Sequence, residues 1–129
     1  MIEKKSLADI LNRLTYLPNR TPEMAFNGGA ELAFSEVAPY RNGAIFVGHY
    51  SGDSEWERHP EGDEIVMCIE GRTTIVLLVN GEQHRIDLNS DELVVVPQGC
   101  WHRFEGSVQL KVLGVTPQPT DHSLDLPDA

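Results

Sequence analysis

Short blocks of hydrophobic and polar residues follow one another along most of this chain, and they predict mainly strands. Apolar residues at 7, 10, 11 and 14 have helical spacing after Ser6, so one short helix is expected over residues 6–14. From residue 31 the pattern changes to strand-length runs separated by turn residues. The runs cover residues 31–38, 44–50, 64–70, 73–79, 83–88, 92–96, 101–104 and 108–115.

Glycine, asparagine and proline mark the turns between these runs. Asn80-Gly81 separates two of them, and Asn-Gly is the strongest short signal of a β-hairpin. Gly71 separates 64–70 from 73–79 and is expected to form a further hairpin turn. Short strands at regular spacing, with no second helix, predict an all-β barrel or sandwich.

The pattern divides the chain into three parts. Residues 1–30 hold the N-terminal helix and a connector, 31–116 form the barrel, and the proline-rich 117–129 form a flexible tail. Runs such as 65–69 and 75–79 are apolar on both faces, so one face lines the barrel and the other packs on a second sheet or a twin subunit. A homodimer is therefore expected, although the pattern alone does not separate these two forms of packing.

The net charge and the cysteine content of the chain indicate which partners and which cellular location to expect. The 129 residues carry a formal charge of −10, which repels phosphate backbones and anionic lipid and disfavours nucleic-acid and membrane partners. No apolar run approaches the length of a membrane span, and no signal peptide is expected. The two cysteines are too few for a disulfide scaffold, so we expect reduced thiols and a cytoplasmic location.

Two segments contain the residues with metal-binding chemistry. Glu57 and His59 are two positions apart, so they project from one face of an extended segment, and Glu64 opens the next strand. The second segment delivers His102 just after a Pro-x-Gly turn. Two imidazoles and a carboxylate from separate strands can converge on one ion and leave coordination positions open for a ligand.

These segments resemble the two motifs of the cupin superfamily. The first family motif is G-x5-H-x-H-x3-4-E-x6-G, and His59, Glu64 and Gly71 match its second histidine, glutamate and final glycine. The second is G-x5-P-x-G-x2-H-x3-N, and Pro97, Gly99 and His102 match at the family's spacing. The resemblance spans roughly residues 40–115. It implies an antiparallel jelly-roll barrel, all-β apart from the N-terminal helix, with a divalent metal in its mouth.

The chain departs from the family pattern at one position that matters. Glu57 stands where the family has its first metal-binding histidine. It could be a fourth, oxygen ligand, or it could hydrogen-bond a ligand histidine. With neither role, His59, Glu64 and His102 still form the two-histidine, one-carboxylate set found in iron(II) oxygenases. The metal could be Fe, Mn, Ni, Co or Zn.

The other candidate residues are expected to have structural roles. His49 is interpreted as a half-buried histidine, and His84 and His122 as solvated ones. Arg58 and Arg103 alternate with the metal-binding positions and are expected to point outward, which argues against an anionic substrate inside the barrel. Four further residues receive packing roles: Cys68 in the core, Trp56 and Trp101 beside the motifs, and Phe104 on the wall of an apolar pocket.

Two functions remain open at this point. The first is a metal-dependent enzyme that acts on a small organic molecule by oxygen activation, isomerisation or lyase chemistry. The second is a non-catalytic module that binds a small molecule and whose metal is structural or absent. Fold resemblance does not choose between them, and no catalytic residue is assigned.

Overall fold

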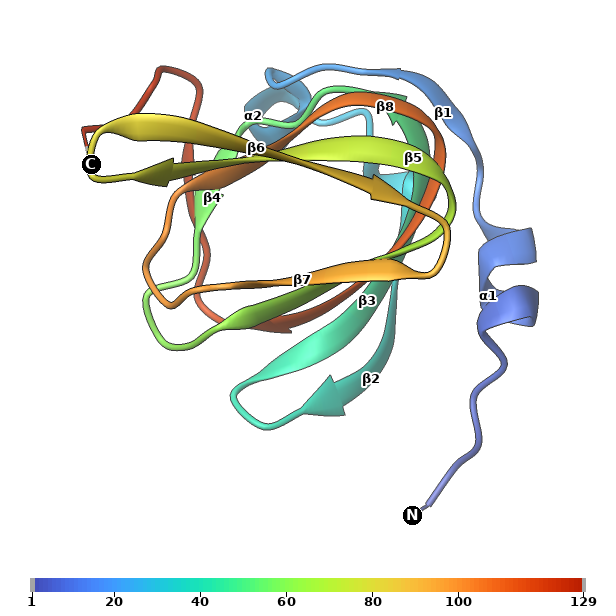
Figure 1. Cartoon of the computed structure of the whole chain (residues 1–129). Helices are drawn as coiled ribbons and strands as arrows, with labels where there is room; N and C mark the ends of the chain where they lie inside the picture. The colour runs from blue at the N-terminus through green and yellow to red at the C-terminus, as the bar shows by residue number, and fades with distance from the viewer. Residues whose placement is uncertain (1, 129) are drawn as a thin grey trace.

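Strands dominate the structure, a computed structural model that describes residues 2–128 (Figure 1). Helix α1 (Leu7–Arg13) forms where the pattern predicts it, and the Ser6 hydroxyl accepts a hydrogen bond from the Asp9 amide at 3.3 Å. The other elements are β1 (Leu17–Arg20), α2 (Met24–Asn27), a 3-10 turn (Glu31–Ala33), β2 (Phe34–Tyr40), β3 (Gly43–Gly52), β4 (Trp56–Arg58), β5 (Glu64–Val79), β6 (Glu82–Asn89), β7 (Glu92–Val96), β8 (His102–Pro117) and β9 (Asp121–Ser123). The predicted all-β class with a short N-terminal helix is confirmed.

Two long strands, β5 and β8, form the frame of the barrel. They pair antiparallel along most of their length, β5 also pairs with β6 and β7, and β8 also pairs with β3 and β4. The strands curl around a common interior, with α1 outside it (Figure 1). The hairpin expected at Asn80-Gly81 is confirmed: Val79 pairs with Glu82, and both turn residues have positive φ.

The hairpin turn expected at Gly71 is wrong, because β5 continues through this residue. The pairing of β5 with β8 shifts register on both sides of Gly71, and the glycine has a φ of 76°. A Cβ added there would lie 2.3 Å from the Gln109 carbonyl oxygen, so only glycine allows this close approach. The irregularity bends the strand without reversing it.

The expected runs 101–104 and 108–115 are likewise one strand, β8. Gly106 has a φ of 61° and Gln109 a φ of 45°, beside the irregular part of β5. The two long strands therefore bend together at one corner of the barrel.

The ends of the chain are more ordered than the sequence pattern indicates. The expected connector contains strand β1, which pairs parallel with β3, and the one-turn helix α2, although no second helix was expected. The expected strand at 31–38 starts at Phe34, after the 3-10 turn. Within the tail, which was expected to be loose, β9 pairs antiparallel with β4. These pairings with distant strands satisfy backbone hydrogen bonds in both segments, and composition alone does not predict them.

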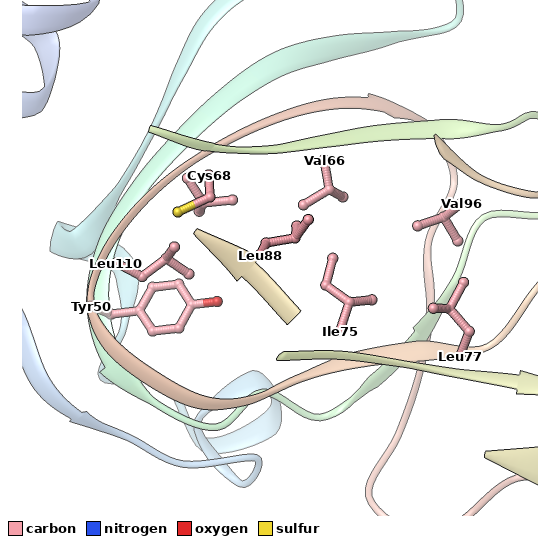
Figure 2. Close-up of a cluster of buried hydrophobic side chains, with 9 residues drawn as sticks. Tyr50, Val66, Cys68, Ile75, Leu77, Leu88, Val96 and Leu110 are labelled. Carbon is pink, nitrogen blue, oxygen red and sulfur yellow. The ribbon is translucent and has the colours of Figure 1, made fainter. Parts of the chain in front are cut away.

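Side chains from several strands form an apolar core inside the barrel. Figure 2 shows most of this cluster pointing into the interior from the surrounding ribbons. Its fully or nearly fully buried members are Tyr50, Val66, Cys68, Ile75, Leu77, Leu88, Val96, Leu110 and Val112. Cys68 therefore has the core role that the sequence suggested. A second cluster packs Trp56 and the partly buried Trp101 against Val76 and Leu78, as expected of the two tryptophans.

The outer face of β5 and β7 stays partly uncovered. Ile65, Leu93 and Val95 are exposed, and Ile65 pairs directly with Val95. This is the kind of apolar face that a twin subunit would cover. The homodimer stays a prediction. No helix within residues 2–128 has the length and apolar character needed to cross a membrane.

We predict that the barrel interior makes a large contribution to stability. Ile75 and Ile86 are cross-strand partners, but Ile75 is 0% exposed and Ile86 is 40% exposed. Ile75→Ala should lower the free energy of unfolding by roughly 2–5 kcal/mol, because it leaves a cavity, whereas Ile86→Ala should cost less than about 1 kcal/mol. Urea denaturation of the two variants measures both values. Equal losses would mean that the interior is not tightly packed.

Candidate metal centre

Backbone pairing brings the two motif segments together. Glu57 on β4 pairs directly with His102 on β8. The Pro-x-Gly turn of the second segment donates the Gly99 amide to the carbonyl of His59 at 3.0 Å. The Gln98 amide of that turn also bonds the Asp63 carboxylate at 2.7 Å. The turn therefore fixes the positions of both histidines relative to each other.

Two imidazoles and one carboxylate meet in this region. Nε2 of His59 lies 3.2 Å from Oε1 of Glu64, and Nε2 of His102 lies 3.0 Å from the same oxygen. The histidines are 2% and 1% exposed, with ring centroids 5.2 Å apart. Despite this closeness, none of the three atoms makes a well-aligned hydrogen bond to any residue of the described chain. Buried polar atoms without partners are costly, so this arrangement fits a group that binds all three.

The opposite ring nitrogens of both histidines are hydrogen-bonded. Nδ1 of His102 lies 3.0 Å from the carbonyl oxygen of Cys100, which can only accept, so Nδ1 carries the proton. Nδ1 of His59 lies 2.9 Å from the Thr120 hydroxyl, which in turn donates to Oε1 of Gln118 at 3.2 Å. These bonds keep a proton on Nδ1 and direct both Nε2 atoms at Glu64, so a neutral imidazole held in this way offers Nε2 to a metal, which is the tautomer that a metal ligand needs.

The Glu64 carboxylate is held by groups from both ends of β8. The Thr116 hydroxyl donates to its Oε2 at 2.6 Å, while His102 contacts its Oε1. Burial alone raises the pKa of Glu64, but His102 and His59 outweigh this effect and lower the pKa to about 2. In the same way, Glu64 overcomes the effect of burial and raises the pKa of His102. The carboxylate is therefore charged at neutral pH.

A long strand can reach one carboxylate from both of its ends only if it bends. A straight strand would place residues 102 and 116 about 45 Å apart, at about 3.3 Å per residue. The corner at Gly106 and Gln109 brings them to the same side chain. Gly114 leaves room for the Thr116 hydroxyl, since a Cβ at this position would lie 3.1 Å from Oγ1 of Thr116.

Glu57 lies at the edge of the same cluster. Its Oε2 is 3.7 Å from Nε2 of His59, and Glu57, His59 and His102 present ligand atoms that all lie within 4.8 Å of one another. Burial, followed by the charges of Glu55 and Glu64, raises the pKa of Glu57 to about 7. Imidazole nitrogens combined with carboxylate oxygens form a donor set that suits Fe, Mn, Ni, Co or Zn.

A cavity of about 470 Å³ opens onto the cluster. Glu57 and Glu64 line it, whereas His59 and His102 do not, so the cavity reaches the cluster on its carboxylate side. Phe104 lines it too, as expected from its place next to the motif histidine. The volume falls within the range of about 300–1,000 Å³ that is typical of small-molecule sites.

Three residues of the cavity were not assigned to the site from the sequence. Arg20 on β1 and Glu55 line it, with Nη2 of Arg20 3.5 Å from Oε1 of Glu55. His122 is exposed, as expected of a solvated tail residue, but its Nδ1 also lies 2.6 Å from Oε2 of Glu55 and the residue lines the cavity. Glu55 also forms a second metal-type cluster with Glu57 and His122. The signal that could have found Glu55 is its alternation with Glu57 and His59 along one extended segment.

The remaining predicted positions agree with their structural roles. His84 is exposed, and His49 is half-buried against the ring of Tyr16. Arg58 lies away from the cavity, where it pairs with Asp121 at 2.9 Å and stacks on Trp101. Arg103 lies over the ring of Trp56 and does not line the cavity either. The argument against an anionic substrate rested on Arg58 and Arg103 alone, and it missed Arg20, which lines the cavity from β1.

Comparisons with known proteins agree with this architecture. The chain resembles a cupin-2 domain protein from Shewanella frigidimarina at 19% identity and a TM-score of 0.54, over 70% of this chain and 79% of that one. It also resembles hydroquinone 1,2-dioxygenase PnpCD, solved with Cd²⁺ and 4-hydroxybenzonitrile, at 17% identity and a TM-score of 0.55, over 65% and 63% of the chains. A third match is oxalate decarboxylase from Bacillus subtilis, which has Mn(II) centres, at 14% identity and a TM-score of 0.51, over 61% and 22%. Likeness at these identities establishes the fold.

No curated protein sequence matches this chain significantly. The family model described as "Cupin domain" matches residues 47–116, which is more than half of the chain and includes β4, β5 and most of β8. With the bent barrel and the histidine–glutamate cluster in its mouth, this match identifies the chain as a member of the cupin family.

Proposed function

We propose that this protein is a metal-dependent enzyme that acts on a small organic molecule, with one divalent ion held by His59, Glu64 and His102. The observation that carries the proposal is the convergence of three buried, unpartnered ligand atoms beside a cavity of about 470 Å³. Cupin-fold neighbours that are dioxygenases and decarboxylases, one solved with Cd²⁺ and one with Mn(II) centres, support the reaction class by analogy.

The chain's own residues prepare the site for such an ion. Cys100 and Thr120 fix the imidazole tautomers, and Thr116 orients the Glu64 carboxylate. A divalent ion bound there would supply Lewis acidity and, if it is redox-active, the capacity to activate oxygen. The cavity would bring the substrate next to the Glu57 and Glu64 side of the cluster. Phe104 and Val66 on the cavity wall would limit the access of water to the reacting atoms.

A non-catalytic binding module is the second candidate, and the position of Glu57 favours it. Its Oε2 lies 3.7 Å from Nε2 of His59, a separation that two ligand atoms on the same ion can have, so with Glu57 the ion would have four protein ligands. A closed four-ligand shell is typical of a structural metal, whereas an open position is typical of a catalytic one. The two candidates therefore differ in whether exchangeable water remains on the metal.

We predict that metal binding depends on both buried histidines. Protein purified without added metal should contain close to one equivalent of a divalent metal by elemental analysis. His59→Ala and His102→Ala should each lower the affinity by at least about 100-fold, more than the loss of an outer hydrogen bond would. His84→Ala is the matched control, because His84 is exposed. Metal that stays bound in both buried-histidine variants would contradict the proposed ligand set.

The number of exchangeable water molecules on a bound Mn²⁺ ion tests whether Glu57 is a metal ligand. Enhanced relaxation of water protons in the Mn²⁺-loaded protein would indicate exchangeable water, and we predict this result for the enzyme. If Glu57 is a ligand, Glu57→Ala should add about one water and weaken binding, while Glu57→His should restore the affinity. A wild-type protein without exchangeable water on the ion would favour the binding module.

Thr120 is predicted to position His59 through its hydroxyl. Thr120→Val keeps the shape but cannot accept the proton of Nδ1, so metal affinity should fall by about 10- to 100-fold. Thr120→Ser keeps the hydroxyl and should retain the affinity. Histidine-selective ¹⁵N NMR of the metal-free variants should show the Nδ1–H form of His59 in wild type and Thr120→Ser, and a mixture in Thr120→Val. Equal affinity in Val and Ser variants would rule out this positioning role.

A further inference from the structure

Arg20 is a cation inside the cavity that originates outside the part of the chain matched to the cupin family. Its side chain is 11% exposed, and its guanidinium carbon lies 4.5 Å from the ring centre of Tyr50 and 4.9 Å from that of Phe34. These contacts are within the range of cation–π interactions. Burial raises the pKa of Tyr50 to about 12, so the ring below Arg20 is a neutral phenol at pH 7.

Most of the hydrogen-bonding capacity of Arg20 is unused. A guanidinium has five N–H donors, and within the described chain the side-chain partners of Arg20 are Glu55, at 3.5 Å, and the nearby Tyr50 hydroxyl. That distance is at the long end for a hydrogen bond, and charge-assisted bonds are normally shorter than 3 Å. None of the Arg20 nitrogens is both buried and unpaired, so the remaining donors are accessible.

The carboxylates near Arg20 already have other partners. Glu55 accepts a 2.6 Å bond from His122, and Glu31 at the cavity wall accepts bonds from the Gly29 amide through both oxygens. Glu57 and Glu64 belong to the metal cluster, where a divalent ion would offset their charge. The guanidinium is therefore left with accessible donors and a shared, distant counter-ion. Such a site favours an oxyanion on the ligand.

The rest of the cavity wall favours a flat apolar body. Aromatic rings come from three separate elements, and aliphatic side chains from β5 and β8 complete the wall. The apolar residues concerned are Phe34, Phe46, Phe104, Val66 and Val112. Gly48 makes the close seating of Phe34 possible, because a Cβ at this position would lie 2.6 Å from the ring. Aromatic walls pack best against planar, apolar ligands.

We infer that the cavity binds a small aromatic monocarboxylate, with the carboxylate on Arg20 and the ring against the phenylalanine side chains. This inference rests on the proposed function, since it names the substrate class of the same site. Arg20 is then a specificity-determining residue. It selects acids over their neutral analogues, while the metal-binding cluster faces another part of the bound molecule.

The test compares benzoate with benzamide, which has the same shape and no charge. Isothermal titration of the full chain should show that benzoate binds more tightly than benzamide. Arg20→Met should weaken benzoate binding by about tenfold or more and leave benzamide within about twofold. Arg58→Met is the matched control, because Arg58 lies outside the cavity, and it should change neither affinity. Arg20→Lys keeps a charge without the planar fork and should give an intermediate affinity; it also serves if Arg20→Met does not fold.

Each titration is repeated with metal-free and metal-loaded protein, because a carboxylate can also bind a metal directly. An Arg20 dependence that persists without metal supports the inference. Benzoate that binds no better than benzamide, or equally well to wild type and Arg20→Met, would overturn it. A protein that binds no metal but shows Arg20-dependent benzoate binding would refute the proposed function and leave this ligand class standing. A protein that binds metal but whose benzoate binding does not depend on Arg20 would refute this ligand class and leave the proposed function standing.

Discussion

The arrangement of His59, His102 and Glu64 depends on how their buried polar atoms are hydrogen-bonded. Two imidazole nitrogens and one carboxylate oxygen face each other at 3.0–3.2 Å without well-aligned hydrogen bonds. Such an arrangement is unfavourable by itself, because desolvated polar groups lose their water without gaining full compensation. The surrounding hydrogen bonds hold it in place. Threonine hydroxyls and the Cys100 carbonyl bind the outer atoms of the three side chains and leave their inner atoms free.

The bend shared by β5 and β8 makes this geometry available. Residues at the two ends of β8 contact one carboxylate, and the irregular pairing around Gly71, Gly106 and Gln109 is what turns the strand back. The same closure buries the apolar cluster inside the barrel. Packing of the core and assembly of the polar site thus depend on one structural feature. Substitutions at this corner would disturb both.

Segments that flank the family-matched region contribute further side chains to the metal cluster and the cavity. The cupin-matched residues 47–116 contain the histidines and glutamates of the cluster. Strand β1 adds Arg20, β9 adds His122, and Thr120 stands just before β9. Pairing of β9 with β4 holds this segment against the strand that carries Glu57. The matched barrel therefore presents the ligand atoms and orients two of them through Cys100 and Thr116, while the flanks orient His59 through Thr120 and bring Arg20 and His122 to the cavity.

The sequence alone determined the all-β class, the Asn80-Gly81 hairpin and the cluster of His59, Glu64 and His102. Each of these depends on local information: alternation of side chains, turn residues with positive φ, and motif spacing within short segments. Tertiary structure alone decided three other features. Gly71 bends a strand instead of ending it, because what approaches it is the backbone of β8, some 38 residues later in the chain. Arg20 and His122 reach the cavity because β1 and β9 pair with strands distant in sequence, and no local pattern encodes that pairing.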